Sequence, residues 1–101
     1  MLKIKTLDDK IIISNPLGRA ESFRLSRMDI FGVIKRNIEA INKEGECCFS
    51  VEKSGQNRSY LILEGNNKIL LPELIAYEIL SRMPLLNQNL KMPSEKIEES
   101  D

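Results

Sequence analysis

The chain has 101 residues and carries fifteen basic and fifteen acidic side chains, so its formal net charge is zero. This length supports one domain, and a hydrophobic fraction of 42% is ordinary for a globular protein. The equal numbers of basic and acidic residues argue against a strongly basic nucleic-acid-binding domain. The chain also lacks an apolar run of about 18 residues, so no transmembrane helix is predicted.

The charges are unevenly distributed along the chain. Residues 1–37 hold eight Lys or Arg and four acids, whereas residues 91–101 hold two Lys and four acids. We expect a mildly basic body and an acidic tail, which either competes with nucleic acid for a basic surface or keeps the protein soluble. The N-terminus lacks the apolar centre of a signal peptide, which indicates an intracellular, cytoplasmic protein. The Lys-, Ile-, Asn- and Glu-rich composition suits a thermophilic archaeal or viral source.

The first part of the chain alternates apolar and polar residues, as short strands do. Residues 2–6 and 10–14 are predicted strands, joined by a hairpin turn at residues 7–9. Asn-Pro-Leu-Gly at residues 15–18 breaks the pattern. Residues 21–25 favour a third strand.

An amphipathic helix is expected next. Ser26, with the acid Asp29 three residues later, fits a capping pattern, so the helix should cover residues 27–42 and end before Gly45. Phe31 is expected beside the apolar stripe of this helix. The stripe recurs at helical spacing and comprises Ile30, Val33, Ile34, Ile38 and Ile41.

The second half repeats this order. Alternating residues 47–53, 58–64 and 68–71 predict three strands, and Gly-Asn-Asn at residues 65–67 predicts a tight turn. Pro72 suits the first turn of a helix that extends to about Arg82 and that Pro84 prevents from continuing.

Residues 23–34 and 69–80 match in pattern at a constant offset of 46 residues. Units of about 45 residues are too small to fold alone, so the two should share one core. We therefore predict an α+β fold in which an antiparallel sheet carries two helices, in the order ββ(β)α-βββα. The domain covers residues 1–86, with pseudo-repeats at about 2–43 and 46–83, and residues 87–101 form a flexible acidic tail.

Few residues suit catalysis or metal binding. The chain has no histidine and no glycine-rich phosphate loop, and its paired acids lie in predicted turns or in the tail. Cys47 and Cys48 are neighbours on a strand, point to opposite faces and cannot form a usual zinc site without histidine. We predict a non-catalytic protein with no cofactor and no metal.

Basic residues and one tyrosine suggest nucleic-acid binding by the sheet. Cations contact phosphates and an aromatic ring stacks on a base, which suits single-stranded DNA or RNA. The plainer interpretation is a solvated sheet face, because Lys on edge strands also blocks aggregation. The candidate residues are Lys3, Lys5, Arg24, Lys53, Arg58, Tyr60 and Lys68.

Three segments resemble parts of a known fold. Residues 21–36 and 67–80 resemble the last strand and helix, and residues 48–63 the central hairpin, of the single-stranded nucleic-acid-binding fold of Pur-alpha repeats, positive cofactor four and the Whirly proteins. This resemblance implies a curved antiparallel sheet followed by a helix in each of two associated units. It also implies that the sheet face that binds single strands carries Lys53, Arg58 and Tyr60.

An alternative function is an accessory subunit that binds a larger protein of the replication or transcription machinery without contacting nucleic acid. An apolar segment beyond the second helix would then form the partner surface, unless it folds back on the core. A homodimer through the helices is compatible with either function. The candidate partner-binding residues are Met83, Leu85, Leu86 and Leu90.

Overall fold

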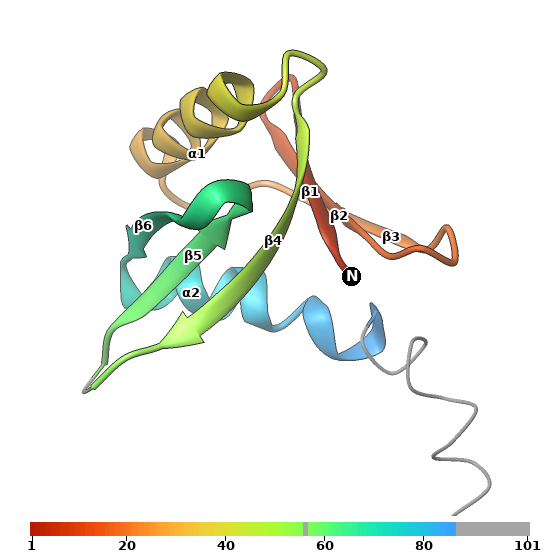
Figure 1. Cartoon of the computed structure of the whole chain (residues 1–101). Helices are drawn as coiled ribbons and strands as arrows, with labels where there is room; N and C mark the ends of the chain where they lie inside the picture. The colour runs from red at the N-terminus through yellow and green to blue at the C-terminus, as the bar shows by residue number, and fades with distance from the viewer. Residues whose placement is uncertain (56, 87–101) are drawn as a thin grey trace, which may run out of the picture.

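The computed structural model of the chain describes residues 1–55 and 57–86 (Figure 1). One antiparallel sheet of six strands is accompanied by two helices, which confirms the predicted α+β class. The elements follow as strand-strand-strand-helix, twice: β1 Lys3–Leu7, β2 Lys10–Ser14, β3 Ala20–Phe23, α1 Met28–Ile41, β4 Glu46–Lys53, β5 Ser59–Leu63, β6 Asn67–Leu71 and α2 Glu73–Leu80.

The two units join through β4, the longest strand. The sheet order is β3-β2-β1-β4-β5-β6, so each unit is a three-stranded meander. Residues 46–48 of β4 pair with β1, whereas residues 49–53 pair with β5. Because the partners use different stretches of β4, the two meanders diverge in direction along it (Figure 1).

A single core lies between one face of the sheet and the two helices. Alternate residues of the strands point into it, as the period of two requires, and α1 and α2 each contribute one face. Since both units supply residues to the same cluster, neither buries its own apolar face alone. The fully buried members include Ile4, Ile11, Ile13, Ile34, Ile38, Leu61, Leu63, Leu71, Ile75 and Ile79.

The predicted cap of the first helix is wrong. Arg27 occupies the N-cap position without a side-chain hydrogen bond, and the helix begins at Met28. The Asp29 carboxylate instead accepts bonds from the Arg27 guanidinium at 3.2 and 2.6 Å, and this contact holds the pKa of Asp29 below its usual value. The Ser26 amide N–H donates to both carboxylate oxygens of Glu78 in α2, at 3.1 and 3.0 Å. A contact across 52 residues has replaced a local cap.

The buried face of α1 is centred differently from the expected stripe. Phe31, predicted to lie beside the stripe, is only 5% exposed and joins Ile34 and Ile38 as the buried residues of the helix. The other predicted members are half-buried at its edges: Ile30, Val33 and Ile41.

The predicted tight turn between β5 and β6 is confirmed. Residues 64–66 form a short 3-10 turn in which Gly65 and Asn66 have φ angles of 77° and 65°. Glycine and asparagine tolerate this left-handed region better than other residues, so the turn follows from its sequence.

The last described residues of the chain attach the second unit to the first. Helix α2 ends at Leu80, residues 81–82 form a turn, and residues 83–86 are helical again. The Asn15 side-chain amide donates to the Leu86 carbonyl oxygen at 3.2 Å. The Arg82 guanidinium lies over the Phe23 ring, 4.3 Å from its centroid.

These contacts correct the expected partner surface beyond α2. Leu86 is only 1% exposed and belongs to the core, and Met83 is half-buried against it. Leu85 is exposed, and Leu90 lies outside the described residues. The segment has folded back because the first unit offers it an apolar surface and a hydrogen-bond donor. The predicted tail, residues 87–101, also lies outside the described residues.

Candidate functional site

The sheet has a second face, which no helix covers in the described part of the chain. The residues that alternate with the core residues point to it, and most are polar or half-exposed. We call it the open face. Its central and second-unit members are Lys3, Lys5, Ile12, Glu46, Cys48, Ser50, Glu52, Tyr60, Ile62, Lys68 and Leu70.

Three neighbouring strands of the second unit bring an aromatic ring and two charges together on the open face. Tyr60 on β5 pairs with Glu52 on β4, and Lys68 lies on β6. The Lys68 ammonium is 5.9 Å from the centroid of the Tyr60 ring and 3.8 Å from a carboxylate oxygen of Glu52. Both charged side chains are more than half exposed, so this cluster is held weakly and opens at little cost.

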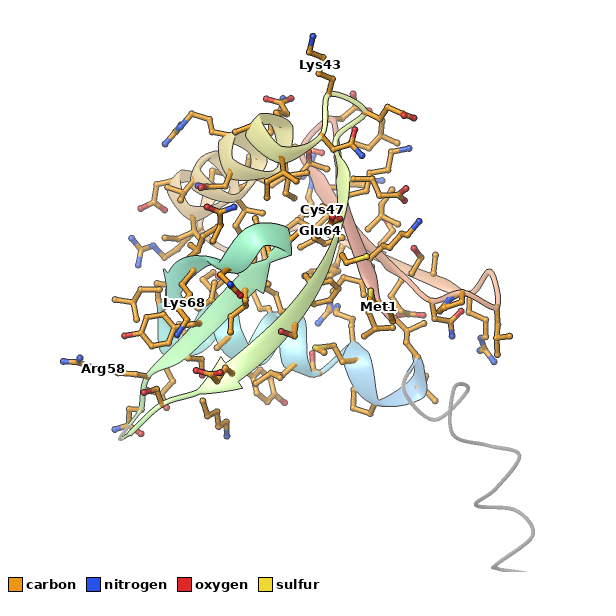
Figure 2. All side chains as sticks on the ribbon, viewed as in Figure 1. Met1, Lys43, Cys47, Arg58, Glu64 and Lys68 are labelled. Atoms are coloured by element: carbon orange, nitrogen blue, oxygen red, sulfur yellow. The ribbon has the colours of Figure 1, made fainter. Side chains whose placement is uncertain are left out.

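Arg58 extends this cluster toward the hairpin between β4 and β5. It immediately precedes β5 and has the same alternation as Tyr60, and Figure 2 shows it at the same end of the sheet as Lys68. It borders a hollow of about 380 Å³ together with Leu70 and Glu73. The structure therefore places Lys68 beside the Tyr60 ring and Arg58 two residues before Tyr60, where Arg58 also borders a hollow on the helix side of the sheet.

Lys53 does not share the open face, so that expectation is wrong. It pairs with the buried Ser59 and alternates with Glu52, which places it on the helix side of β4. There it borders a hollow of about 330 Å³ that Tyr77 and Leu80 of α2 also line. The face of a strand residue depends on register, and Lys53 is an odd number of residues away from Glu52, Ser50 and Cys48.

The remaining predicted cations lie in the first unit. Lys3 and Lys5 are on the open face of β1, but Glu46 of β4 lies directly opposite Lys5. Arg24 follows β3 and forms an exposed ion pair with Asp9 in the β1–β2 turn. The acids of β4 thus separate two groups of cations, Lys3 and Lys5 on one side and Arg58 and Lys68 on the other.

A shallow hollow beside the Tyr60 cluster was not predicted from the sequence. It measures about 480 Å³ and is lined by Met1, Cys48, Ser50, Ile62 and Glu64, among others. Glu64 accepts a hydrogen bond from the Cys48 amide N–H at 2.8 Å, at the point where β5 ends. The hollow forms where β1 and β5 diverge from β4, so only the strand pairing reveals it.

The second unit also exposes apolar residues on the helix side. Leu74 and Tyr77 of α2 are 70% and 71% exposed, although the sequence repeat aligns Tyr77 with the buried Phe31. The sequence signal was available: six of the eight residues of α2 are apolar, so its outer side carries apolar residues beside its two glutamates.

Cysteine chemistry does not define this site. Cys47 is buried and Cys48 half-buried, and the two are not bonded to each other. Burial raises the pKa of the Cys47 thiol, which keeps it protonated and unreactive at neutral pH. Residues 1–55 and 57–86 contain no group of three His, Cys, Asp or Glu side chains arranged for a metal ion.

No protein-family model, curated protein or solved structure matches this chain. Among the described residues, no helix is both long and apolar enough to cross a membrane.

Proposed function

We propose that this protein is a small, non-catalytic, cytoplasmic protein that binds single-stranded nucleic acid on the open face of its second unit. One observation carries the proposal: Tyr60 lies between Arg58 and Lys68 on a sheet face that no described helix covers. An aromatic ring flanked by two cations provides the two contacts that a single strand offers, which are a base plane and its phosphates.

The proposed binding step exchanges one partner of the Tyr60 ring for another. A base stacks on the ring, and the Lys68 ammonium moves from the ring to the adjacent phosphate. The exchange is inexpensive because Lys68 is exposed and its contact with Glu52 is 3.8 Å long. Duplex DNA offers no accessible base plane, so this cluster should prefer single strands.

Two features of the structure make the open face better supported than the accessory-subunit alternative. The apolar segment predicted for that role contributes Leu86 to the core and leaves Met83 half-buried. The cations predicted for nucleic acid remain exposed at Lys3, Arg58 and Lys68.

The test is fluorescence anisotropy with a labelled single strand of about 25 nucleotides, beside the matching duplex, at low and moderate salt. Tyr60→Ala should weaken binding to the single strand about tenfold, because stacking contributes roughly 1–3 kcal/mol per base. Tyr60→Phe keeps the ring and should bind normally.

The charge-matched control is Lys43→Ala, since Lys43 follows α1 and lies far from Arg58 and Lys68 (Figure 2). Arg58→Ala should weaken binding and Lys43→Ala should not. An absence of binding at micromolar protein would refute the proposal. Equal loss in both variants, or a preference for the duplex, would also refute it, once circular dichroism shows that the variants are folded.

A further inference from the structure

Helix α2 carries large apolar residues on its outer side as well as on the side that faces the core. Ile75, Ala76 and Ile79 face the core, whereas Leu74 and Tyr77 are 70% and 71% exposed. Only Glu73 and Glu78 are charged among its eight residues, and the Ser26 amide N–H holds the Glu78 carboxylate. The outer face of α2 therefore has the character of a surface that something covers.

Helix α1 provides an internal reference, because it follows the third strand of the first unit as α2 follows the third strand of the second. Its outer face carries Lys35, Arg36 and Glu39, as expected for contact with water. The fold thus accommodates a polar outer helix face. The apolar face of α2 is a property of this sequence and not a requirement of the architecture.

A charged groove adjoins the apolar face. The hollow of about 330 Å³ is bordered by two cations, Lys53 and Arg58 of the β4–β5 hairpin, and by one acid and three apolar residues of α2, which are Glu73, Ala76, Tyr77 and Leu80. Lys53 and Arg58 form no ion pair with any residue of the described chain. Such a groove suits an occupant that combines an apolar anchor with carboxylates.

The chain itself contains a segment of this composition. Residues 95–101 have the sequence Glu-Lys-Ile-Glu-Glu-Ser-Asp, with four acids, one lysine and one isoleucine. We propose that residues 95–101 bind in the groove between α2 and the β4–β5 hairpin. Ile97 would contact Tyr77 and Leu80, and the flanking carboxylates would face Lys53 and Arg58.

Chain length permits this contact. Six peptide units separate Leu80, at the groove, from Leu86, so their Cα atoms are at most about 23 Å apart. The eleven residues from Leu86 to Ile97 span up to roughly 36 Å when extended. A tethered segment has an effective concentration of the order of millimolar, so even a weak contact would be well populated.

The absence of tryptophan from the chain allows a direct test in the full-length protein. Tyr77→Trp introduces one fluorophore at the centre of the apolar face. If residues 95–101 cover it, its emission is blue-shifted and resists acrylamide quenching. Adding Ile97→Ser, or the set Glu95→Gln, Glu98→Gln, Glu99→Gln and Asp101→Asn, should shift the emission to the red and increase quenching. Ser94→Ala is the control within the same segment and should change neither.

The same measurement separates the other possible occupants. A blue shift that depends on protein concentration and ignores the changes at residues 95–101 would identify a second copy and overturn the proposal. A fluorophore equally exposed in every variant, or one covered only after a single-stranded oligonucleotide is added, would also overturn it. Leu74→Trp provides a second reporter on the same face if Tyr77→Trp does not fold. Without an added oligonucleotide, the comparison of these variants does not depend on whether the open face binds nucleic acid.

Discussion

At the scale of single residues, Asn15 shows how one buried polar side chain can organise a junction. Its amide nitrogen donates to the Leu86 carbonyl, and its Oδ1 accepts from the Leu17 and Arg19 amide N–H groups at 3.0 and 3.1 Å. The side chain thus shapes the β2–β3 turn and attaches the end of the second unit to it. A buried amide with three bonds is costly to remove, because its partners then lose their pairing.

Asn15→Ala should lower the free energy of unfolding by about 2 kcal/mol. Asn42→Ala is the matched control, since the Asn42 side chain accepts one exposed bond, from the Glu44 amide at 2.9 Å. Asn42→Ala should lower the free energy of unfolding by only about 0.5 kcal/mol. Urea denaturation followed by circular dichroism measures both, and equal costs would contradict the role given to Asn15.

The two adjacent cysteines should differ in reactivity. Burial raises the pKa of Cys47, so its reactive thiolate is scarcer than in an ordinary thiol at the same pH. Iodoacetamide at about pH 7.5 should modify Cys48 first, and Cys47 should be modified in the folded protein only as the pH rises above its raised pKa. Mass spectrometry of the Cys47→Ser and Cys48→Ser variants over a pH series checks this order. Faster modification of Cys47 would disprove it.

At the scale of elements, the two units are joined by contacts between parts distant in sequence. Glu78 of α2 accepts the Ser26 amide before α1, and Arg82 covers the Phe23 ring at the end of β3. The segment after α2 then adds Leu86 to the shared core. Each contact lies between the units, so the two should unfold together and not in sequence.

The adjacent residues Leu85 and Leu86 provide a test of these contacts between the units. Leu86→Ala should lower the free energy of unfolding by about 2–5 kcal/mol, because it leaves a cavity in the core. Leu85→Ala should cost about 0.5 kcal/mol or less, because Leu85 is 56% exposed. Urea denaturation compares them. If Leu85→Ala costs as much as Leu86→Ala, the segment packs differently from the structure described above.

At the scale of the whole molecule, the charge pattern limits how strongly nucleic acid can bind. The net charge is zero, and Glu46, Glu52 and Glu64 lie along β4 and at the end of β5 between the two groups of cations. A strand bound at the Tyr60 cluster therefore meets only a few cations. Binding should depend on stacking more than in a strongly basic protein.

This limit predicts a shallow dependence on salt. With about three phosphates neutralised, the logarithm of affinity should fall with the logarithm of salt concentration at a slope of about −2. Affinity should then drop roughly 20-fold between 50 and 200 mM salt. Anisotropy titrations at four salt concentrations measure the slope. A slope steeper than about −5 would show that more cations take part than the Tyr60 cluster and its neighbours supply.

Local sequence patterns determined the class of fold and the position of most elements. The alternation in residues 58–64 and the helical spacing from Ile30 to Ile41 are properties of short stretches, and short-range geometry sets them. The turn at Gly65 and Asn66 follows for the same reason. The alternation within residues 58–64 was enough to put Arg58 and Tyr60 on the same side, whereas Lys68 joins them through the pairing of β5 with β6.

Tertiary structure decided what depends on pairing between distant segments. The packed core decided that the β4 face carrying Lys53 is the one that the helices cover, and the Glu78 carboxylate binds the Ser26 amide N–H in place of a local cap. The same holds for Leu86, whose burial requires a surface built from the other unit. Periodicity states which residues share a face. Only the packed core decides which face is covered, because burial is a property of the surfaces that meet and not of one segment.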